Sequence, residues 1–294
     1  MVKNNSNLRI FTLNCGGQLL TTEKPLLMGI LNTTPDSFFS DSRVSGPEQL
    51  IQQAARMLEQ GADILDIGGQ STRPSGSLIT AAEEWERVAE PIRLLHSHFP
   101  KAILSIDTFY ASVARNAVET GVTIINDISG GQFDPDMLTT AGHLQVPYIC
   151  MHIPGSINNM HELPQYKQVT RDVLDYFIQK KEACERAGIR DLVIDPGFGF
   201  GKTMEQNFEL LQQLDLLQLT GLPILAGVSR KSMIWKTLGI TPAEALNGTT
   251  VLHTAALLAG VSILRVHDVR EAREAITLVD AIKKSAPVNQ GRID

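Results

Sequence analysis

The chain has 294 residues and a net charge of −6; 43% of its residues are apolar and 20% are charged. This length suffices for one large core or for two domains, and the acidic balance argues against a nucleic-acid-binding surface. No apolar run approaches the roughly 20 residues of a membrane span. The N-terminal residues MVKNNSNLRIF lack the apolar region of a signal peptide, so we expect a cytoplasmic protein.

The first elements in the chain read as a β-hairpin. Apolar segments at Leu8–Leu13 and Gln18–Thr21 flank Gly16-Gly17, which is a turn signal. The hairpin precedes the first core strand, so we interpret it as a cap on the floor of the fold.

Eight short apolar runs follow, each bounded by turn residues, as is typical of strands buried on both faces of a parallel sheet. They are Leu26–Leu31, Asp63–Ile67, Ala102–Ile106, Val122–Ile125, Pro147–Cys150, Asp191–Ile194, Pro223–Ala226 and Ser262–Leu264. Helical patterns between them are clearest at Pro47–Gln60, Ala81–His98, Tyr110–Thr120 and Gln165–Ala187. Asp268, with Glu271 three residues later, predicts a capping pair at the start of the last helix.

Strands that alternate with helices imply parallel pairing, and eight such units imply a single (β/α)8 TIM barrel. We therefore expect one domain over residues 1–294, with residues 286–294 as a flexible tail. In such a barrel the active site lies at the C-terminal ends of the strands.

Polar residues follow nearly every predicted strand and would converge at the barrel mouth. They are Asn32, Asp107, Asn126, Asp195, Lys231, Arg265 and His267. Buried carboxylates need donors, and a flat heterocycle with several N–H groups would supply them. Alternatively, these side chains only bind one another or cap turns. The presence of Asp107, Asn126 and Asp195 at the same end of the barrel favours a ligand site.

The cations at the mouth have several interpretations. Lys231 can be a Schiff-base amine, a hydrogen-bond donor to a ligand, or an exposed lysine at the start of a helix. Arg265 and His267 are two residues apart on an extended segment and share a side, so with Asn32 they can form an anion site. A surface arginine and a core histidine are the alternative.

The glycine-rich stretch from Gly197 to Lys202 resembles a phosphate-binding loop, but that motif requires glycine where Pro196 stands. We interpret its glycines as allowing close backbone approach to a flat ligand. The cysteines (Cys15, Cys150 and Cys184) read as buried or bystander thiols. No set of histidines and carboxylates has metal spacing, so a metal would bind through an anionic ligand.

Nine stretches, taken together and in this order, closely resemble the dihydropteroate synthase family of folate-pathway transferases, from about Leu26 to Ile282. The stretches are GILNTTPDSFF, DIGGQSTRP, SIDT, IIND, MH, DPGFGFGK, SRKS, LNGTT and LRVHD. The resemblance implies a (β/α)8 barrel that joins 4-aminobenzoate to 6-hydroxymethyl-7,8-dihydropterin pyrophosphate and releases pyrophosphate with Mg²⁺. It also implies a homodimer.

The resemblance assigns site residues motif by motif. The pterin set is Asp107, Asn126, Ile128, Met151, Asp195, Phe200 and Lys231. The pyrophosphate set is Asn32, Thr72, Arg265 and His267, with Asn32 near the Mg²⁺. The 4-aminobenzoate set is Phe38, Thr72, Pro74 and Ser232. The resemblance implies catalytic roles for Lys231, Asp107, Asp195 and Arg73.

Two positions depart from the family pattern. Pro154-Gly155 stands where many members have a basic residue before the glycine, and Ser75 interrupts the common Arg-Pro-Gly of the second loop. Three other interpretations are a methyltetrahydrofolate-binding methyltransferase domain, an aldolase that uses Lys231 covalently, and a pterin-binding protein without activity. If pyrophosphate leaves before the amine attacks, Asp107 and Asp195 would stabilise the pterin cation.

Overall fold

A computed structural model describes residues 10–33, 45–70, 78–155 and 166–285 of the chain. The chain begins with an antiparallel hairpin of β1 (Thr12–Cys15) and β2 (Gln18–Thr21). Its two turn residues, Gly16 and Gly17, have φ of +63° and +94°, as a two-residue hairpin turn requires. The hairpin is confirmed, although its first strand begins at Thr12 and extends to Cys15.

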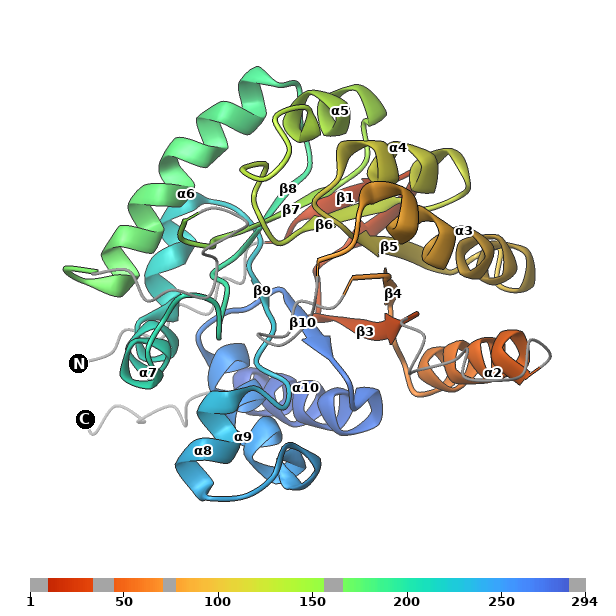
Figure 1. Ribbon diagram of the computed structural model, residues 1–294. Coiled ribbons are helices and arrows are strands. Elements are labelled where there is room, and N and C mark those ends of the chain that lie inside the picture. The colour runs from red at the N-terminus through yellow and green to blue at the C-terminus, as the bar shows by residue number, and fades with distance from the viewer. Residues whose placement is uncertain (1–9, 34–44, 71–77, 156–165, 286–294) are drawn as a thin grey trace, which may run out of the picture.

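Eight parallel strands form the barrel (Figure 1). They are β3 (Leu26–Asn32), β4 (Ile64–Gly68), β5 (Ile103–Asp107), β6 (Ile124–Asp127), β7 (Tyr148–Met151), β8 (Leu192–Asp195), β9 (Leu225–Ala226) and β10 (Ile263–Val266). They are bonded in the order β8-β7-β6-β5-β4-β3-β10-β9, and a parallel bridge between Ile194 and Ile224 joins the two ends. The predicted TIM barrel is confirmed.

Helices surround the barrel on its outside (Figure 1). They are α2 (Ser45–Glu59), α3 (Ala81–His98), α4 (Ala111–Glu119), α5 (Met137–Leu144), α6 (Val169–Arg186), α7 (Met204–Gln212), α8 (Ser232–Leu238), α9 (Leu246–Leu258) and α10 (Val269–Lys284), with the 3-10 helices η1 (Leu214–Thr220) and η2 (Pro242–Glu244). In the described ranges, none of the helices combines the length and apolar character needed to cross a membrane.

The ends of two helices test the sequence prediction. α3 has the predicted bounds because Thr80 and Glu83 form a reciprocal capping box, with Thr80 Oγ1 accepting from Glu83 N at 3.3 Å. The capping pair predicted for α10 is wrong. Asp268 occupies the N-cap position but makes no side-chain cap bond, since its carboxylate binds Arg230 instead.

Alternating side chains fill the barrel interior in layers. The lowest layer, which we call the floor, is apolar, and the hairpin packs against it through Leu13 and Cys15. Its strand residues are Leu26, Met28, Ile64, Ile103, Ile124, Ile149, Val193, Leu225 and Ile263. Two residues further along several of these strands, the inward positions become polar. The hairpin therefore closes the end of the barrel opposite the candidate site, as predicted.

Candidate functional site

The strand register aligns the predicted site residues across the mouth of the barrel. Asn32 pairs with Gly68, Gly68 with Asp107, and Asp107 with Asn126 in neighbouring strands. Across the barrel, Met151 of β7 pairs with Asp195 of β8. Because the sheet is parallel, these C-terminal strand residues lie at one end of the barrel.

An arginine at the centre of the mouth binds two carboxylates. Arg265 of β10 donates from Nε to Asp66 Oδ2 at 2.6 Å and from Nη2 to Asp107 Oδ2 at 2.7 Å. Asn126 Nδ2 also donates to Asp66 Oδ2, at 3.0 Å. Four strands are therefore joined by one polar network. The resemblance assigns Arg265 to the pyrophosphate, whereas its guanidinium lies here among carboxylates on the pterin side.

Asp66 is a site residue that the sequence analysis did not identify. Its side chain is fully buried in the middle of β4, and its Oδ1 has no hydrogen-bond partner among the described residues. The available signal was a single acid inside the apolar run Ile64–Ile67, at the same inward parity as Ile64. A charge at such a position needs a buried partner.

Burial changes the proton affinity of these groups. It raises the pKa of the Asp107 carboxyl, while the Arg265 guanidinium acts in the opposite direction. Burial likewise raises the pKa of Asp195, whose Oδ1 accepts from Gly197 N at 2.8 Å. The pKa of Arg265 is raised by Asp66 and Asp107 despite its own burial, so it stays charged.

Lys231 completes the polar set. Burial lowers its pKa to about 8, against the attraction of Asp195. Its Nζ lies 4.3 Å from the centroid of the Phe200 ring, and a Cβ on Gly199 would come within 3.2 Å of Lys231 Cδ. Phe200 and Gly199, both in the loop after β8, thus fix the path of this lysine.

An apolar wall faces the polar network. Ile128 and Met151, which the resemblance assigns to the pterin, belong to one buried cluster, and the partly buried Phe200, assigned likewise, packs against it. The cluster also contains Phe109 and Ile153, which the sequence analysis did not identify. Flat apolar and aromatic side chains next to convergent polar groups are typical of a site for a small heterocyclic ligand.

His267 and Ser232 lie at the rim. Ser229 Oγ lies 3.0 Å from His267 Nδ1 and accepts from His267 N at 3.2 Å. Burial and the neighbouring Arg265 lower the pKa of His267, so its ring is neutral at neutral pH. Ser232 is the first residue of α8. Phe38, Thr72, Arg73, Pro74 and Ser75 lie outside the described residues.

A second buried lysine lies behind the mouth. Lys202 Nζ donates to the carbonyls of Gly197 at 2.9 Å and Phe200 at 3.1 Å, and lies 3.1 Å from His152 Nδ1. Burial lowers the pKa of Lys202 to about 7. This lysine holds the loop after β8 from beneath and contacts the buried ring of His152.

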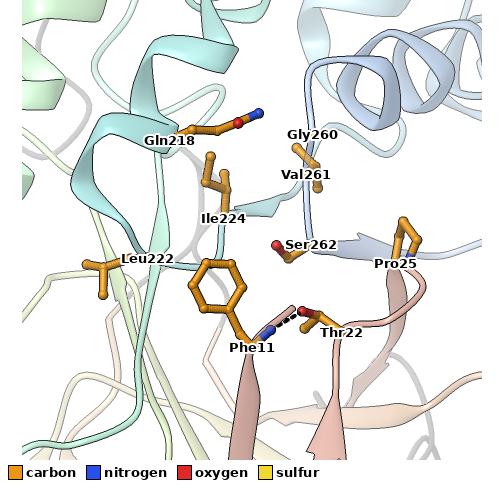
Figure 2. Close-up of a pocket in the computed structure, with 9 residues that line it drawn as sticks. All are labelled: Phe11, Thr22, Pro25, Gln218, Leu222, Ile224, Gly260, Val261 and Ser262. Carbon is orange, nitrogen blue, oxygen red and sulfur yellow. Dashed lines mark hydrogen bonds between the residues drawn. The ribbon is translucent and has the colours of Figure 1, made fainter. Parts of the chain in front are cut away.

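Two hollows lie in different parts of the molecule. A polar groove of about 530 Å³ runs from His267 and Asp268 along α2. A cavity of about 30 Å³ lies at the floor between the hairpin and η1, where Phe11 N donates to Thr22 Oγ1 at 2.8 Å (Figure 2). The floor cavity has room for only one or two water molecules. Within the described ranges, no three His, Cys, Asp or Glu side chains are grouped to hold a metal ion.

The comparison with known proteins agrees with this geometry. The model of the pterin-binding enzyme family matches residues 28–267. A dihydropteroate synthase of Escherichia coli is 39% identical over 267 residues, covering 90% of this chain and 94% of that protein. The chain belongs to the dihydropteroate synthase family.

Solved structures extend the dihydropteroate synthase match to three dimensions. A Xanthomonas albilineans dihydropteroate synthase with 4-aminobenzoic acid has a TM-score of 0.86 at 38% identity, covering 94% of this chain and 99% of that one. A Yersinia pestis dihydropteroate synthase in complex with a sulfonamide drug also has a TM-score of 0.86 at 38% identity, covering 94% and 100%. A further X. albilineans structure holds 7,8-dihydropteroate, with a TM-score of 0.84 at 36% identity, covering 94% and 100%. The family predicted from the motifs is confirmed.

Proposed function

We propose that this chain condenses 4-aminobenzoate with 6-hydroxymethyl-7,8-dihydropterin pyrophosphate to give 7,8-dihydropteroate and pyrophosphate. The observation that carries the proposal is the Arg265 network at the barrel mouth, in which one guanidinium binds Asp66 and Asp107. In a chain of this family, such a buried network would present oriented acceptors to the ring of a pterin and keep a cation beside the leaving group.

The pterin subsite is built from complementary groups. Asp107, Asn126 and Asp195 offer acceptors and an amide from three strands, and Lys231 offers donors. Ile128, Met151 and Phe200 provide an apolar surface for the ring. Because a site with buried polar groups leaves them unpaired when the wrong ligand binds, this set favours a ligand with several N–H groups.

The charge distribution supports a dissociative order of steps. Arg265 is bound to Asp66 and Asp107 at the mouth, and Asp195 ends β8 across the barrel; ionised carboxylates in such places would stabilise a cationic ring in a medium of low dielectric constant. The C–O bond to pyrophosphate would therefore break first. The electron pair of that bond leaves with the pyrophosphate, and the amine of 4-aminobenzoate then adds and loses its proton.

The leaving group would be held by Asn32, Arg265, His267 and Thr72. Arg265 links this subsite to the pterin, since it is bound to Asp66 and Asp107 on one side. His267 is neutral at neutral pH and contributes an N–H donor rather than a charge. For 4-aminobenzoate we propose Ser232 at the start of α8 together with Phe38, Thr72, Arg73 and Pro74, which lie outside the described residues.

We propose that Mg²⁺ accompanies the pyrophosphate, with Asn32 as its protein ligand. Asn32 Oδ1 and Asp107 Oδ2 each lie 3.7 Å from the point that a Cβ on Gly68 would occupy. The glycine thus leaves an oxygen-lined space, and amide and phosphate oxygens are the hard donors that Mg²⁺ prefers. When bound, the ion neutralises charge on the departing pyrophosphate. Calorimetry should show that Asn32→Ala removes the Mg²⁺ dependence of pyrophosphate binding.

A pyrophosphate-release assay with and without 4-aminobenzoate tests the activity. We expect release that depends on 4-aminobenzoate and is inhibited competitively by a sulfonamide. Pterin binding without release would identify a binding protein, and a borohydride-reducible adduct on Lys231 would identify an aldolase.

An isotope experiment tests the order of steps. The substrate carries ¹⁸O at the bridging oxygen, and benzoate replaces 4-aminobenzoate, so we expect the label to scramble into non-bridging positions. If the label does not scramble in a sample in which rotation of the pyrophosphate has been shown separately, the reaction is a direct displacement.

We also propose that the chain is a homodimer that joins through α9 and α10. Val251 and Leu258 of α9 and Leu278 and Ile282 of α10 are 54–66% exposed, and the two helices lie side by side (Figure 1). Sedimentation should show a dimer. The double variant Leu278→Ser, Ile282→Ser should dissociate it, whereas Leu219→Ser on η1 should have no effect.

The buried free thiols support a cytoplasmic location.

A further inference from the structure

The turn that delivers Lys231 to the site has an unusual backbone. Arg230, the residue before it, has φ of +52°, and only one other non-glycine residue of the described chain, Gln145, has a positive φ. Gln145 ends α5 in the left-handed conformation, which is ordinary at helix C-termini. Arg230 instead lies between β9 and α8, where such a conformation persists only if the surroundings enforce it.

The side chain of Arg230 is bound on every edge. Nε and Nη2 donate to the two oxygens of Asp268 at 2.8 and 2.9 Å. Nη1 donates to the carbonyls of Pro242 at 3.0 Å and Ala243 at 2.8 Å. The backbone N of Arg230 donates to Thr249 Oγ1 at 3.1 Å. One residue is thus attached to the β10–α10 connection, to η2 and to α9.

A second contact runs beside the first. Ser229, the residue before Arg230, bonds through Oγ to both the backbone N and the ring of His267. Two adjacent residues after β9 are therefore joined to two adjacent residues after β10. The fold uses the Asp268 carboxylate for this connection even though α10 then has no side-chain cap.

We propose that Arg230 is a positioning residue for the reaction proposed above. Its guanidinium, held by Asp268, maintains the left-handed turn that directs Lys231 over Phe200 and starts α8 at Ser232. If φ at residue 230 relaxed to a negative value, every atom beyond it would rotate about the N–Cα bond, and Lys231 would leave its place. The planar, bidentate fork explains why arginine stands here, since a lysine offers only a point charge.

The floor of the barrel offers a matched control. Arg273 of α10 donates from Nη2 to Asp63 Oδ2 at 2.6 Å, and its side chain is 30% exposed, compared with 25% for Arg230. It also donates to a backbone carbonyl, that of Gly61. This pair ties the first half of α10 to the floor end of β4, and neither residue contacts Lys231. Arg230→Gln and Arg273→Gln therefore remove similar ion pairs at opposite ends of the barrel.

The test measures dihydropteroate formation, calorimetric affinity for the pterin pyrophosphate and the urea midpoint of each variant. We expect both variants to lose stability, while only Arg230→Gln loses kcat/KM, by about 10- to 100-fold, because small misplacements of a site group are costly. Arg230→Lys should remain impaired, and ethylguanidinium added to Arg230→Ala should restore activity. Equal activity losses in the two glutamine variants, or no loss in either, would overturn the proposal. If Arg230→Gln does not fold, Asp268→Asn replaces it in the same comparison.

A fluorescence measurement separates this proposal from the proposed function. Trp235 lies one turn into α8, and Trp85→Phe leaves it as the only tryptophan of the chain. Arg230→Gln should shift the Trp235 emission, and Arg273→Gln should not. If the unmodified chain forms no dihydropteroate, the proposed function fails, and this shift alone then supports the positioning role. An unshifted spectrum overturns it.

Discussion

The floor and the mouth of the barrel are made by the same strands, but their inward-pointing side chains differ in polarity. On β10, Ile263 points inward at the floor and Arg265 points inward at the mouth, two residues later. On β8, the corresponding pair is Val193 and Asp195. The floor layer is entirely apolar and is covered by the hairpin. The mouth layer carries charges that bind one another, and among the described residues Asp66 Oδ1 has no hydrogen-bond partner.

This difference shows where stability and function lie in the fold. Packing an apolar layer stabilises the barrel without further conditions. A buried charge network stabilises only while all its members are present, and apolar replacements of a whole network are often no less stable. The mouth therefore retains its carboxylates and cations for the ligand, while the floor supports the strands that align them.

Two substitutions on β10 test the comparison most strongly. Arg265→Met leaves Asp66 and Asp107 buried without their cation, which should cost about 3–5 kcal/mol of unfolding free energy and abolish measurable dihydropteroate formation. Ile263→Ala should cost a similar amount, about 2–5 kcal/mol, by opening a cavity. Its kcat/KM should stay within about twofold of the original chain, because the mouth is untouched. Urea unfolding and steady-state kinetics on both variants test this expectation. A comparable activity loss in Ile263→Ala would contradict the assignment of stability to the floor and function to the mouth.

A buried acid behind the mouth should make stability depend on pH. Burial, followed by the nearby Asp107, raises the pKa of Glu84 to about 8, and Thr108 Oγ1 donates to its Oε2 at 3.2 Å. Between its ordinary pKa and about 8, the folded chain keeps a proton that the unfolded chain has lost, so stability falls as pH rises. Glu84→Gln resembles the protonated acid and should be the more stable form at pH 8, by on the order of 2–4 kcal/mol.

The neighbouring Glu83 gives a control of opposite sign. The Thr80 backbone bond lowers the pKa of this exposed capping acid. Its contribution is therefore present above its unfolded pKa and is lost as pH falls, so Glu83→Gln should be destabilising at pH 8. Urea midpoints at pH 5, 6.5 and 8 measure the slope caused by Glu84, and midpoints at pH values below 4.5 measure the slope caused by Glu83. A Glu84→Gln slope identical to that of the original chain would show that Glu84 does not carry the effect.

The sequence predicted the features that depend on local pattern. Apolar runs located all eight strands within about two residues, and the polar positions that follow them located the mouth. Features that depend on distant partners were not predictable. Arg265 and Asp66 are 199 residues apart, and Arg230 and Asp268 are 38 apart. Local pattern assigned Asp268 to a helix cap, but a guanidinium supplied by another connection competes for the same carboxylate and binds it.

A smaller effect is expected on β8. Asp195→Asn replaces one acceptor oxygen by a donor that faces ring N–H groups, and such a change costs about 1.5–3 kcal/mol of binding free energy. Calorimetric affinity for the pterin pyrophosphate should therefore fall by roughly 10- to 150-fold. Val193→Ala, one layer lower, should lower the urea midpoint and leave this affinity unchanged. An unaltered affinity in Asp195→Asn would remove Asp195 from the pterin subsite.

The smallest effect should come from the aromatic contact of Lys231. Phe200 presents its ring 4.3 Å from Lys231 Nζ, and such a contact favours the ammonium by about 0.5–1 kcal/mol. Phe200→Leu keeps an apolar wall but removes the ring, so pterin affinity should fall about two- to fivefold. The ring also helps to keep the proton on Lys231, whose pKa is already lowered to about 8 by burial. The affinity of Phe200→Leu should therefore begin to decline at a lower pH than that of the original chain. Ile128→Val, in the apolar cluster against which Phe200 packs, should reduce affinity without changing the pH at which affinity begins to decline. If both variants change that pH equally, the apolar cluster acts through burial alone, and the Phe200 ring has no electrostatic role.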